Sequence, residues 1–447
     1  MPSRSMFKVL PVVAFMAMAL APAAQAQSLQ AMYDAARGHD ASFISAKAQF
    51  EANLAKANQA LGGVLPNIAL SASASRTDFS SRLDGQTIPT ERMFSTGVAS
   101  INLVQPIYRP AAWAAYRQGG QQLLQAAAQF EAAEQDLLVR VTQAYFDVLT
   151  SEDSLTFVRA QKQAVGEQLA SAKRNFEVGT ATITGVRDAQ ARFDLTTAQE
   201  IAAENDVRIK RLALDLVVGL QNAQPKRLAN NTKLVEPPKE KIDDWVSKSE
   251  LESPLVKQAM LAHEVAKLEV DKATAGHKPT LDAQLSYAGT RNVNGNAFSN
   301  VGSHVFNPSA AVVLNVPLFA GLTTMYRIRE ATALENKARS DLEAAKRNTA
   351  QATRTAYFGL MSGLSQVKAY EAAEASSQSA LDANKLGYSV GVNINIDVLN
   401  SQSQLYQTKR DLAKARYDVL VGNLKLRQAA GTLLPQDLES INSLLSP

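Results

Sequence analysis

Hydrophobic and polar residues alternate with period two in four short segments of this chain, and the polar positions are mostly serine, asparagine and glutamine. Such alternation predicts β-strands with one apolar and one polar face. The four predicted strands lie around residues 68–74, 94–105, 281–287 and 306–316. A sheet of this kind suits either a soluble core or a barrel with lipid outside and water inside. Alternation alone favours the soluble core.

A different periodicity extends from Pro110 to about Phe176, where apolar residues recur at alternating steps of four and three and no further proline occurs. A heptad pattern of this length predicts one continuous helix with coiled-coil packing. At a rise of 1.5 Å per residue the helix would be about 100 Å long. A twin is expected over residues 321–387, with a fainter stripe richer in alanine and serine. The faint stripe indicates contact with several neighbours.

Both long helices end in a tight turn, and the turns share a Val-Gly pair: Val178-Gly179-Thr180 and Val390-Gly391-Val392. Glycine supplies the left-handed backbone that a helix end favours. Return helices are then expected as far as Leu220 and Ala430.

Shorter helices are expected before each strand pair, over residues 28–61 and 254–275, and polar loops over 77–92 and 292–303 are expected to join the paired strands. Proline lacks an amide donor and biases the preceding residue toward extended backbone. Four prolines therefore mark the predicted helix–strand junctions: Pro66, Pro106, Pro279 and Pro317.

The same unit occurs twice in the chain. Ala144-Tyr145-Phe146 returns as Ala356-Tyr357-Phe358, and the Val-Gly turn returns at the same distance of 212 residues. This length far exceeds the roughly 20–50 residues of solenoid repeats, so one large unit is built twice. The expected organisation is a signal peptide (1–26), a first repeat (27–220), a linker or equatorial region (221–253), a second repeat (254–431) and a C-terminal tail (432–447).

The first residues predict export from the cytoplasm. Arg4 and Lys8, the apolar stretch after them, and Ala24-Gln25-Ala26 form the three parts of a secretory signal peptide. The formal net charge of the whole chain is only +4, and acidic and basic residues are interleaved, which gives no support for nucleic-acid binding. The chain has no cysteine, which excludes disulfides, thiol catalysis and thiolate metal sites.

An enzyme is not expected from this sequence. The four histidines show no metal-ligand spacing, and neither a Gly-x-Ser-x-Gly motif nor a phosphate loop occurs, so no catalytic residue, metal or cofactor is predicted. A periplasmic adaptor protein with helical hairpins is the main alternative. That class predicts one hairpin flanked by β-rich domains, whereas this sequence indicates two hairpins interleaved with four strands.

Four strands cannot close a barrel, and unpaired strand edges are not tolerated in lipid. A membrane sheet would therefore require oligomerisation. Two protomers would supply eight strands, whose interior fills with side chains, whereas three would supply twelve and leave a passage. Aromatic residues gather at the strand–helix joints and fit either a membrane-interface girdle or ordinary packing: Tyr108, Trp113, Tyr116, Phe319 and Tyr326.

The duplicated strand–strand–long-helix cassette, with Phe176-Glu177 and Tyr388-Ser389 before the Val-Gly pairs and Ala429-Ala430-Gly431 near the end, resembles the TolC family of outer-membrane exit ducts. The resemblance covers the whole mature chain. It implies an α+β membrane protein in which a trimeric 12-stranded outer-membrane β-barrel, four strands per protomer, continues into a long α-helical coiled-coil barrel with an internal two-fold repeat. The missing N-terminal cysteine is similar to the non-lipidated branch of the family.

This resemblance also implies a function. The expected protein is a passive homotrimeric channel in the outer-membrane lipid of a Gram-negative cell, extending into the periplasm and gated at its periplasmic tip. It would serve tripartite efflux pumps, type I protein secretion or both. The implied partners are a periplasmic adaptor protein and an inner-membrane RND pump or ABC transporter. The sequence leaves the cargo open, because the specificity of such a passive duct lies in its pump.

In that family, side chains near the two turns hold the tip closed. By resemblance, the gate tyrosine is Tyr388 and its threonine partner is Thr184, whereas the two positions of the charged lock hold Asn393 and Gly185. A charged hydrogen bond contributes about 1.5–3 kcal/mol against roughly 1 kcal/mol for a neutral one. A weaker or differently wired closed state is therefore expected.

The two acidic-ring positions of the family correspond to Asp397 and Asn400, so only one ring remains. Asp397 could instead cap the return helix. Arg187 and Asp188 are candidate replacements for the missing lock, although solvated helix charges are the simpler interpretation. The expected adaptor contacts are the two turns, Val178 to Thr180 and Val390 to Val392.

Overall fold

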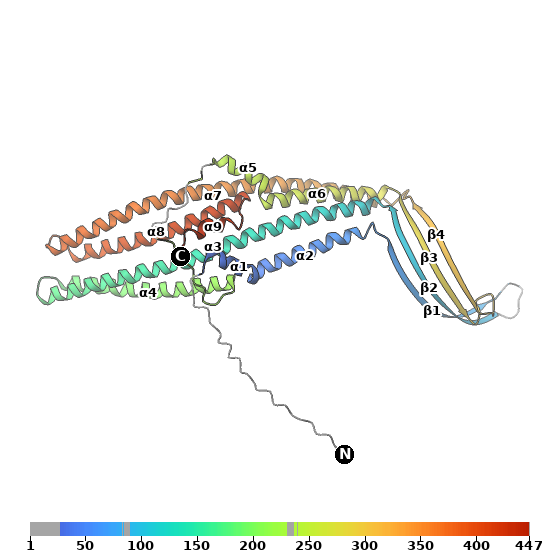
Figure 1. Cartoon of the computed structure of the whole chain (residues 1–447), viewed down its shortest axis with the longest axis horizontal. Helices are drawn as coiled ribbons and strands as arrows, with labels where there is room; N and C mark the ends of the chain where they lie inside the picture. Colours follow the sequence, from blue (N-terminus) through green and yellow to red (C-terminus); the bar gives the residue numbers. More distant parts are fainter. Residues whose placement is uncertain (1–26, 83, 85–89, 230–236, 239, 447) are drawn as a thin grey trace, which may run out of the picture.

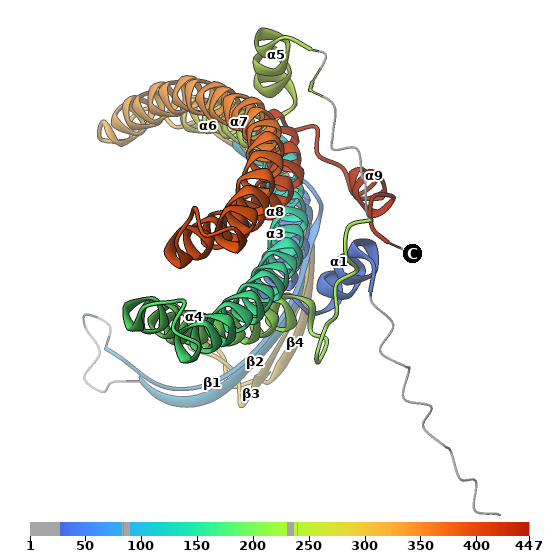
Figure 2. The same cartoon turned by 90° about the vertical axis from the view of Figure 1, so that its left-hand side faces the viewer.

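The computed structural model describes residues 27–82, 84, 90–229, 237–238 and 240–446 (Figure 1). The predicted signal peptide lies outside these residues. A four-stranded sheet forms one end of the molecule, and long helices extend from it to the opposite end. Viewed along the long axis, the helices form an arc, with the short helices α1, α5 and α9 on its convex side (Figure 2).

The sheet is antiparallel with strand order β1-β2-β3-β4. Its strands are β1 (Asn67–Ser81), β2 (Thr90–Tyr108), β3 (Thr280–Val293) and β4 (Ser303–Asn315). The four predicted strands are therefore confirmed. The predicted loop over 77–92 was too long, because the β1–β2 ladder continues as far as the Ser81–Thr90 pair despite its turn-like composition.

Pro106 was placed wrongly at a helix–strand junction. It lies inside β2, where the register with β3 shifts between Pro106 and Tyr108. A proline is tolerated at such an irregularity because it has no amide hydrogen to give to the ladder. Pro66 and Pro279 each precede the first residue of a strand, and Pro317 follows the end of β4.

The helices follow the predicted order. Their bounds are α1 (Leu29–His39), α2 (Ala41–Leu61), α3 (Pro110–Glu177), α4 (Ile183–Val218), α5 (Ile242–Glu252), α6 (Pro254–Thr274), α7 (Thr323–Ser389), α8 (Asn395–Ala430) and α9 (Asp437–Asn442). The two long helices contain 68 and 67 residues, as the heptad pattern required. In the part of the chain described, no helix combines the length and apolar character needed to cross a membrane.

Each long helix is covered by two shorter ones in succession. α4 packs on the half of α3 that is far from the sheet, and α2 packs on the half near it (Figure 1). α8 and α6 take the same places on α7. α3 also contacts α6 and α8, so the two hairpins form one curved layer of helices.

The predicted single helix over 28–61 is broken at Asp40. The Asp40 backbone is extended, and its carboxylate accepts a hydrogen bond of 2.8 Å from the amide of Phe43 in the first turn of α2. Asp40 thus caps a new helix, which composition alone did not reveal. The second copy has the same break at Ser253, between α5 and α6. α5, which lies in the range expected to be a linker, packs on α7 and α8 as α1 packs on α3 and α4.

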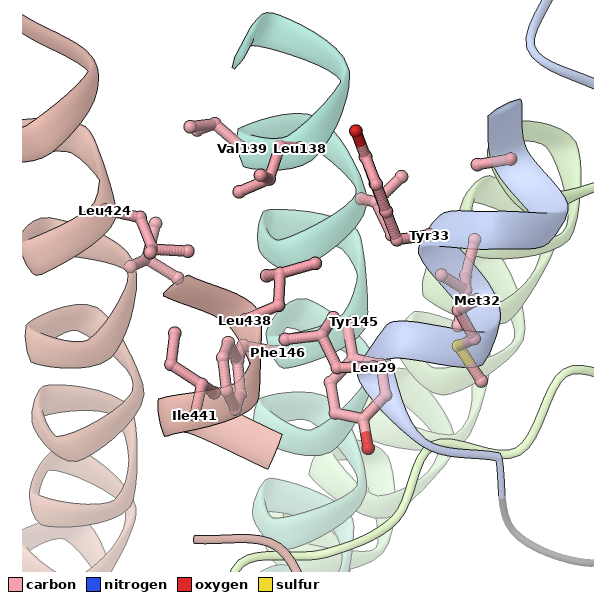
Figure 3. Packing of buried hydrophobic residues seen from close by; sticks show 14 of the residues in the cluster. Leu29, Met32, Tyr33, Leu138, Val139, Tyr145, Phe146, Leu424, Leu438 and Ile441 are labelled. Atoms are coloured by element: carbon pink, nitrogen blue, oxygen red, sulfur yellow. The ribbon is translucent and has the colours of Figure 1, made fainter. Parts of the chain in front are cut away.

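The largest apolar cluster lies midway along the helices, and we call it the equatorial core (Figure 3). α1 and α9 cover the middle of α3 and the last turns of α8 there. Tyr145 and Phe146 are at most 1% exposed, and the ring of Phe146 stacks on Tyr417 at 5.4 Å between centroids. The Tyr417 hydroxyl donates a 2.7 Å hydrogen bond to Asp153, which joins α8 to α3.

Candidate functional site at the helical tips and the sheet

Two turns of the same geometry form the tips of the hairpins. Gly179 and Gly391 have φ values of 78° and 80°. The amides of the next two residues donate to one carbonyl of the preceding helix, that of Asn175 in the first turn and that of Gly387 in the second. A side chain at either glycine would strain the left-handed backbone by about 1–2 kcal/mol. This constraint explains why both copies keep the Val-Gly pair.

Apolar side chains surround these glycines without cover. Val178, Val390 and Val392 are 74%, 66% and 79% exposed. Such side chains at the end of a long rod form an interaction surface because burying them against a partner releases water from apolar surface. These turns are the expected adaptor contacts.

Four hydrogen bonds join the two hairpins near the tips. Asn175 Nδ2 donates to Tyr388 Oη at 3.1 Å, and Arg192 Nη2 donates to Asn400 Oδ1 at 2.8 Å. Asn395 links the same helices twice: its Oδ1 accepts from Gln168, and its Nδ2 donates to the carbonyl of Gly185 at 3.4 Å. Every acceptor in this set is neutral.

The gate residues inferred from the sequence take partly different partners. Tyr388 contacts Asn175, whereas the hydroxyl of Thr184 lies 2.7 Å from that of Thr182 in its own turn. Asn393 donates at 2.7 Å to Asn384 inside its own hairpin. Within one protomer, the tyrosine thus reaches the first hairpin through a different residue than the resemblance implied.

The charged candidates also have defined positions. Asp397 accepts a 3.2 Å hydrogen bond from the amide of Ile394 and so caps α8. Arg187 and Asp188 are exposed, and neither forms an ion pair within the residues that the structure describes. Sequence reasoning missed Asn175, Gln168 and Asn395. The available signal was the presence of amides beside the apolar stripe close to each turn.

The sheet has two chemically distinct faces. On one face, Ser71 pairs with Ser100 and Ser286 with Ser309, each at 2.8 Å between hydroxyl oxygens. Thr96 donates to Asn292 at 3.0 Å on the same face. On the other face the strand register aligns large apolar side chains, most of which are at least half exposed: Ile68, Leu70, Ile101, Leu285, Tyr287, Phe306, Val312 and Leu314.

Both outer strands of this sheet are open. The ladder pairs β1 only with β2 and β4 only with β3 in the described residues. The aromatic side chains at the joints are exposed as well, with Trp113 and Tyr116 in edge contact at 6.1 Å. An exposed apolar sheet face with a hydrogen-bonded polar face behind it defines the class of protein: a protomer of a β-barrel membrane channel with a helical extension.

The comparison with known families agrees with this class. The chain belongs to the outer membrane efflux protein family, whose model matches residues 32–220 and 245–432. It is therefore an outer-membrane efflux channel protomer, and its helices extend into the periplasm. The adaptor alternative has no support.

Relatives match over nearly the whole chain. The outer membrane protein TolC of Vibrio cholerae is 33% identical, with 98% of each chain covered. The alkaline protease secretion protein AprF of Pseudomonas aeruginosa is 30% identical, with 92% of this chain and 85% of AprF covered. The CmeC outer membrane channel of Campylobacter jejuni has the same fold, with a TM-score of 0.79 at 15% identity over 100% of this chain and 98% of CmeC.

Proposed function

We propose that three copies of this chain join edge to edge into a twelve-stranded barrel, which continues into a helical tunnel and exports cargo through the outer membrane. The observation that carries this proposal is the pair of open edges on a sheet whose outer face is apolar. In lipid, each unpaired backbone group would cost several kcal/mol, so β1 must pair with β4 of a neighbouring copy.

Three copies fit the sheet better than two. An eight-stranded barrel packs its interior with side chains, whereas twelve strands enclose a passage. The polar face offers small hydroxyl and amide side chains that already bond to one another, and it has no apolar cluster to fill a closed core. Such a face suits a water-filled lumen.

The tips supply the docking surface for partners. We infer that the exposed valines of the two turns contact a periplasmic adaptor, which couples the duct to an inner-membrane RND pump or ABC transporter. The names of AprF and of the protease secretion protein PrtF, which is 27% identical over 93% of this chain, support protein secretion as one use. The family match supports efflux as another.

Disulfide trapping tests the assembly, because the chain has no native cysteine. Cysteines placed along β1 and β4 should cross-link only between protomers and give a covalent trimer on a denaturing gel. Cysteines at Ser100 and Ala288, which face each other across β2 and β3, are the matched control and should cross-link within one chain. A product that stops at the dimer would refute the twelve-stranded barrel.

Deleting the gene tests the transport. We expect both greater drug susceptibility and loss of a secreted protein from the medium, each restored by the wild-type chain. If the barrel forms but neither phenotype changes, the proposed cargo classes are wrong and the assembly stands.

Asp397 is proposed to contribute a ring of three carboxylates at the constriction. Asp397→Asn separates this role from capping, since the amide oxygen can still accept from the Ile394 amide. Cation selectivity in planar bilayers should fall because three like charges attract cations to the axis. Unchanged selectivity would leave Asp397 with the capping role alone.

A further inference from the structure

A polar cavity of about 410 Å³ lies between α3, α4 and α8, and residues of both hairpins line it. Gln161 of α3, Arg192 and Gln199 of α4, and Asn400 and Arg410 of α8 contribute to its wall. These residues of α4 begin nine positions after its first residue, which places the cavity roughly 15–25 Å from the tip. The cavity is therefore separate from the turns and from Asp397.

Two arginines of opposite hairpins face this cavity without a carboxylate. Within the described chain, Arg192 donates to the neutral Asn400 at 2.8 Å, and Arg410 donates to the neutral Gln407 at 2.5 Å. Neither guanidinium takes part in any of the ion pairs of this region. Two cations in one cavity repel each other unless an anion lies between them.

Nearby carboxylates are occupied elsewhere. Glu200 accepts from Lys162 at 2.7 Å and from Arg159 at 3.2 Å on the α3 side, and Arg159 also pairs with Glu204. Asp411, the carboxylate closest in sequence to Arg410, accepts from Gln407. Neither group neutralises the cavity.

Arg410 is the most informative member of the set. Its Nε is buried and has no hydrogen-bond partner in the described residues. Burial lowers the pKa of Arg410, and the nearby Asp411 only partly opposes this effect. A buried guanidinium donor without an acceptor is unfavourable, and an oxyanion would satisfy it.

The cavity also offers acceptors. The Oε1 atoms of Gln161 and Gln199 are buried without a partner among the described residues, and Gln161 as a whole is only 6% exposed. A ligand that fits both kinds of group carries oxyanion oxygens together with a hydroxyl hydrogen. Hydrogen phosphate has both, whereas sulfate has acceptors alone.

We propose that this cavity binds a small hydroxylated oxyanion of the phosphate class, held between Arg192 of the first hairpin and Arg410 of the second. The bound anion links α4 to α8. Because each arginine belongs to a different hairpin, occupancy stabilises the arrangement in which the hairpins lie together. The site thus makes the tip region sensitive to a periplasmic anion.

Isothermal titration of the purified full chain in detergent tests the site directly, with phosphate added at constant ionic strength in a chloride buffer. Binding should weaken roughly tenfold to a hundredfold in Arg192→Gln and Arg410→Gln, because each loses a charged hydrogen bond. Arg208→Gln is the matched control, since Arg208 is exposed on α4 and does not line the cavity. Arg410→Lys, which keeps the charge, guards against misfolding and should bind better than Arg410→Gln.

The outcomes separate the parts of the proposal. Equal affinity in wild type and in both glutamine variants, or no binding by wild type, would overturn the site. Sulfate binding as tightly as phosphate would overturn the role of the two glutamine oxygens. Binding that leaves single-channel conductance unchanged would overturn the link between hairpins. The titration does not depend on transport, so its failure is distinct from failure of the exit-duct function.

Discussion

The equatorial core and the helical tips are built from the same long helices, yet their chemistry is opposite. At the equator, large side chains are buried and charged groups are paired, as in the contact of Arg140 with Asp40 at 3.0 Å. At the tips, valines are exposed and the hairpins are joined through neutral acceptors. This difference locates the stability of the molecule in its middle and leaves its end free to rearrange at a small energetic cost.

Truncation of the equatorial core should have the largest effect. Phe146→Ala removes a ring that is 1% exposed and stacked on Tyr417, so it should lower the free energy of unfolding by about 3–5 kcal/mol. Phe176→Ala at the tip is the matched control. Its ring is 43% exposed, and the loss should stay below about 1 kcal/mol. Urea unfolding of the purified variants measures both, and equal losses would remove the contrast between the regions.

Acid should weaken the equator through Asp40. Burial by itself would raise the pKa of this carboxyl, but hydrogen bonds from Arg140, Ser42 and the Phe43 amide outweigh it and lower the pKa to about 2. A depressed folded-state pKa stabilises the protein above the unfolded pKa of about 4 and loses this contribution as the pH falls toward 2.

Comparison of wild type with Asp40→Asn isolates that contribution. The difference in unfolding free energy should be about 1–2 kcal/mol above pH 4 and should shrink between pH 4 and pH 2. Urea midpoints at several pH values measure it. A difference that does not vary with pH would show that Asp40 acts only as an uncharged helix cap.

At the tip, Tyr388→Phe removes the hydroxyl that accepts from Asn175. Loss of one neutral hydrogen bond should shift the balance between hairpin arrangements by about 1 kcal/mol, or roughly fivefold. Single-channel conductance and entry of a bulky antibiotic should rise. Tyr370→Phe, higher on α7, serves as the control and should change neither. A silent Tyr388→Phe would mean that this contact does not hold the tip.

Reversal of charge at Arg187 should have the smallest effect. The side chain is exposed without an ion pair in the described part of the protomer, so Arg187→Glu should change stability by less than about 0.5 kcal/mol. Conductance is expected to stay at the wild-type level. A clear increase would instead assign Arg187 to a lock that forms between protomers.

Much of this architecture could be inferred from periodicity. The heptad stripe ending near Phe176 located α3 to within one residue of its end, because a long coiled-coil helix repeats one local pattern. Alternation located all four strands for the same reason. The break at Asp40 escaped notice, since its capping contact with Phe43 is a single local event within a helical composition.

The candidate site was only partly readable. The turn glycines were identified because φ values near 80° require them at both tips. The partner of Tyr388 was not, since Asn175 lies 213 residues away and meets it only when the two hairpins pack together. The cavity between Arg192 and Arg410 was also missed, because neither arginine stands in a recognisable motif.

The sequence by itself therefore determined the elements, their duplication and the family, because these follow from local periodicity and from short motifs that recur along one chain. The tertiary structure decided which side chains meet across the hairpins and which charges lack a partner. Those facts depend on how α3, α4 and α8 pack, and packing brings together residues whose separation along the chain leaves no local signal.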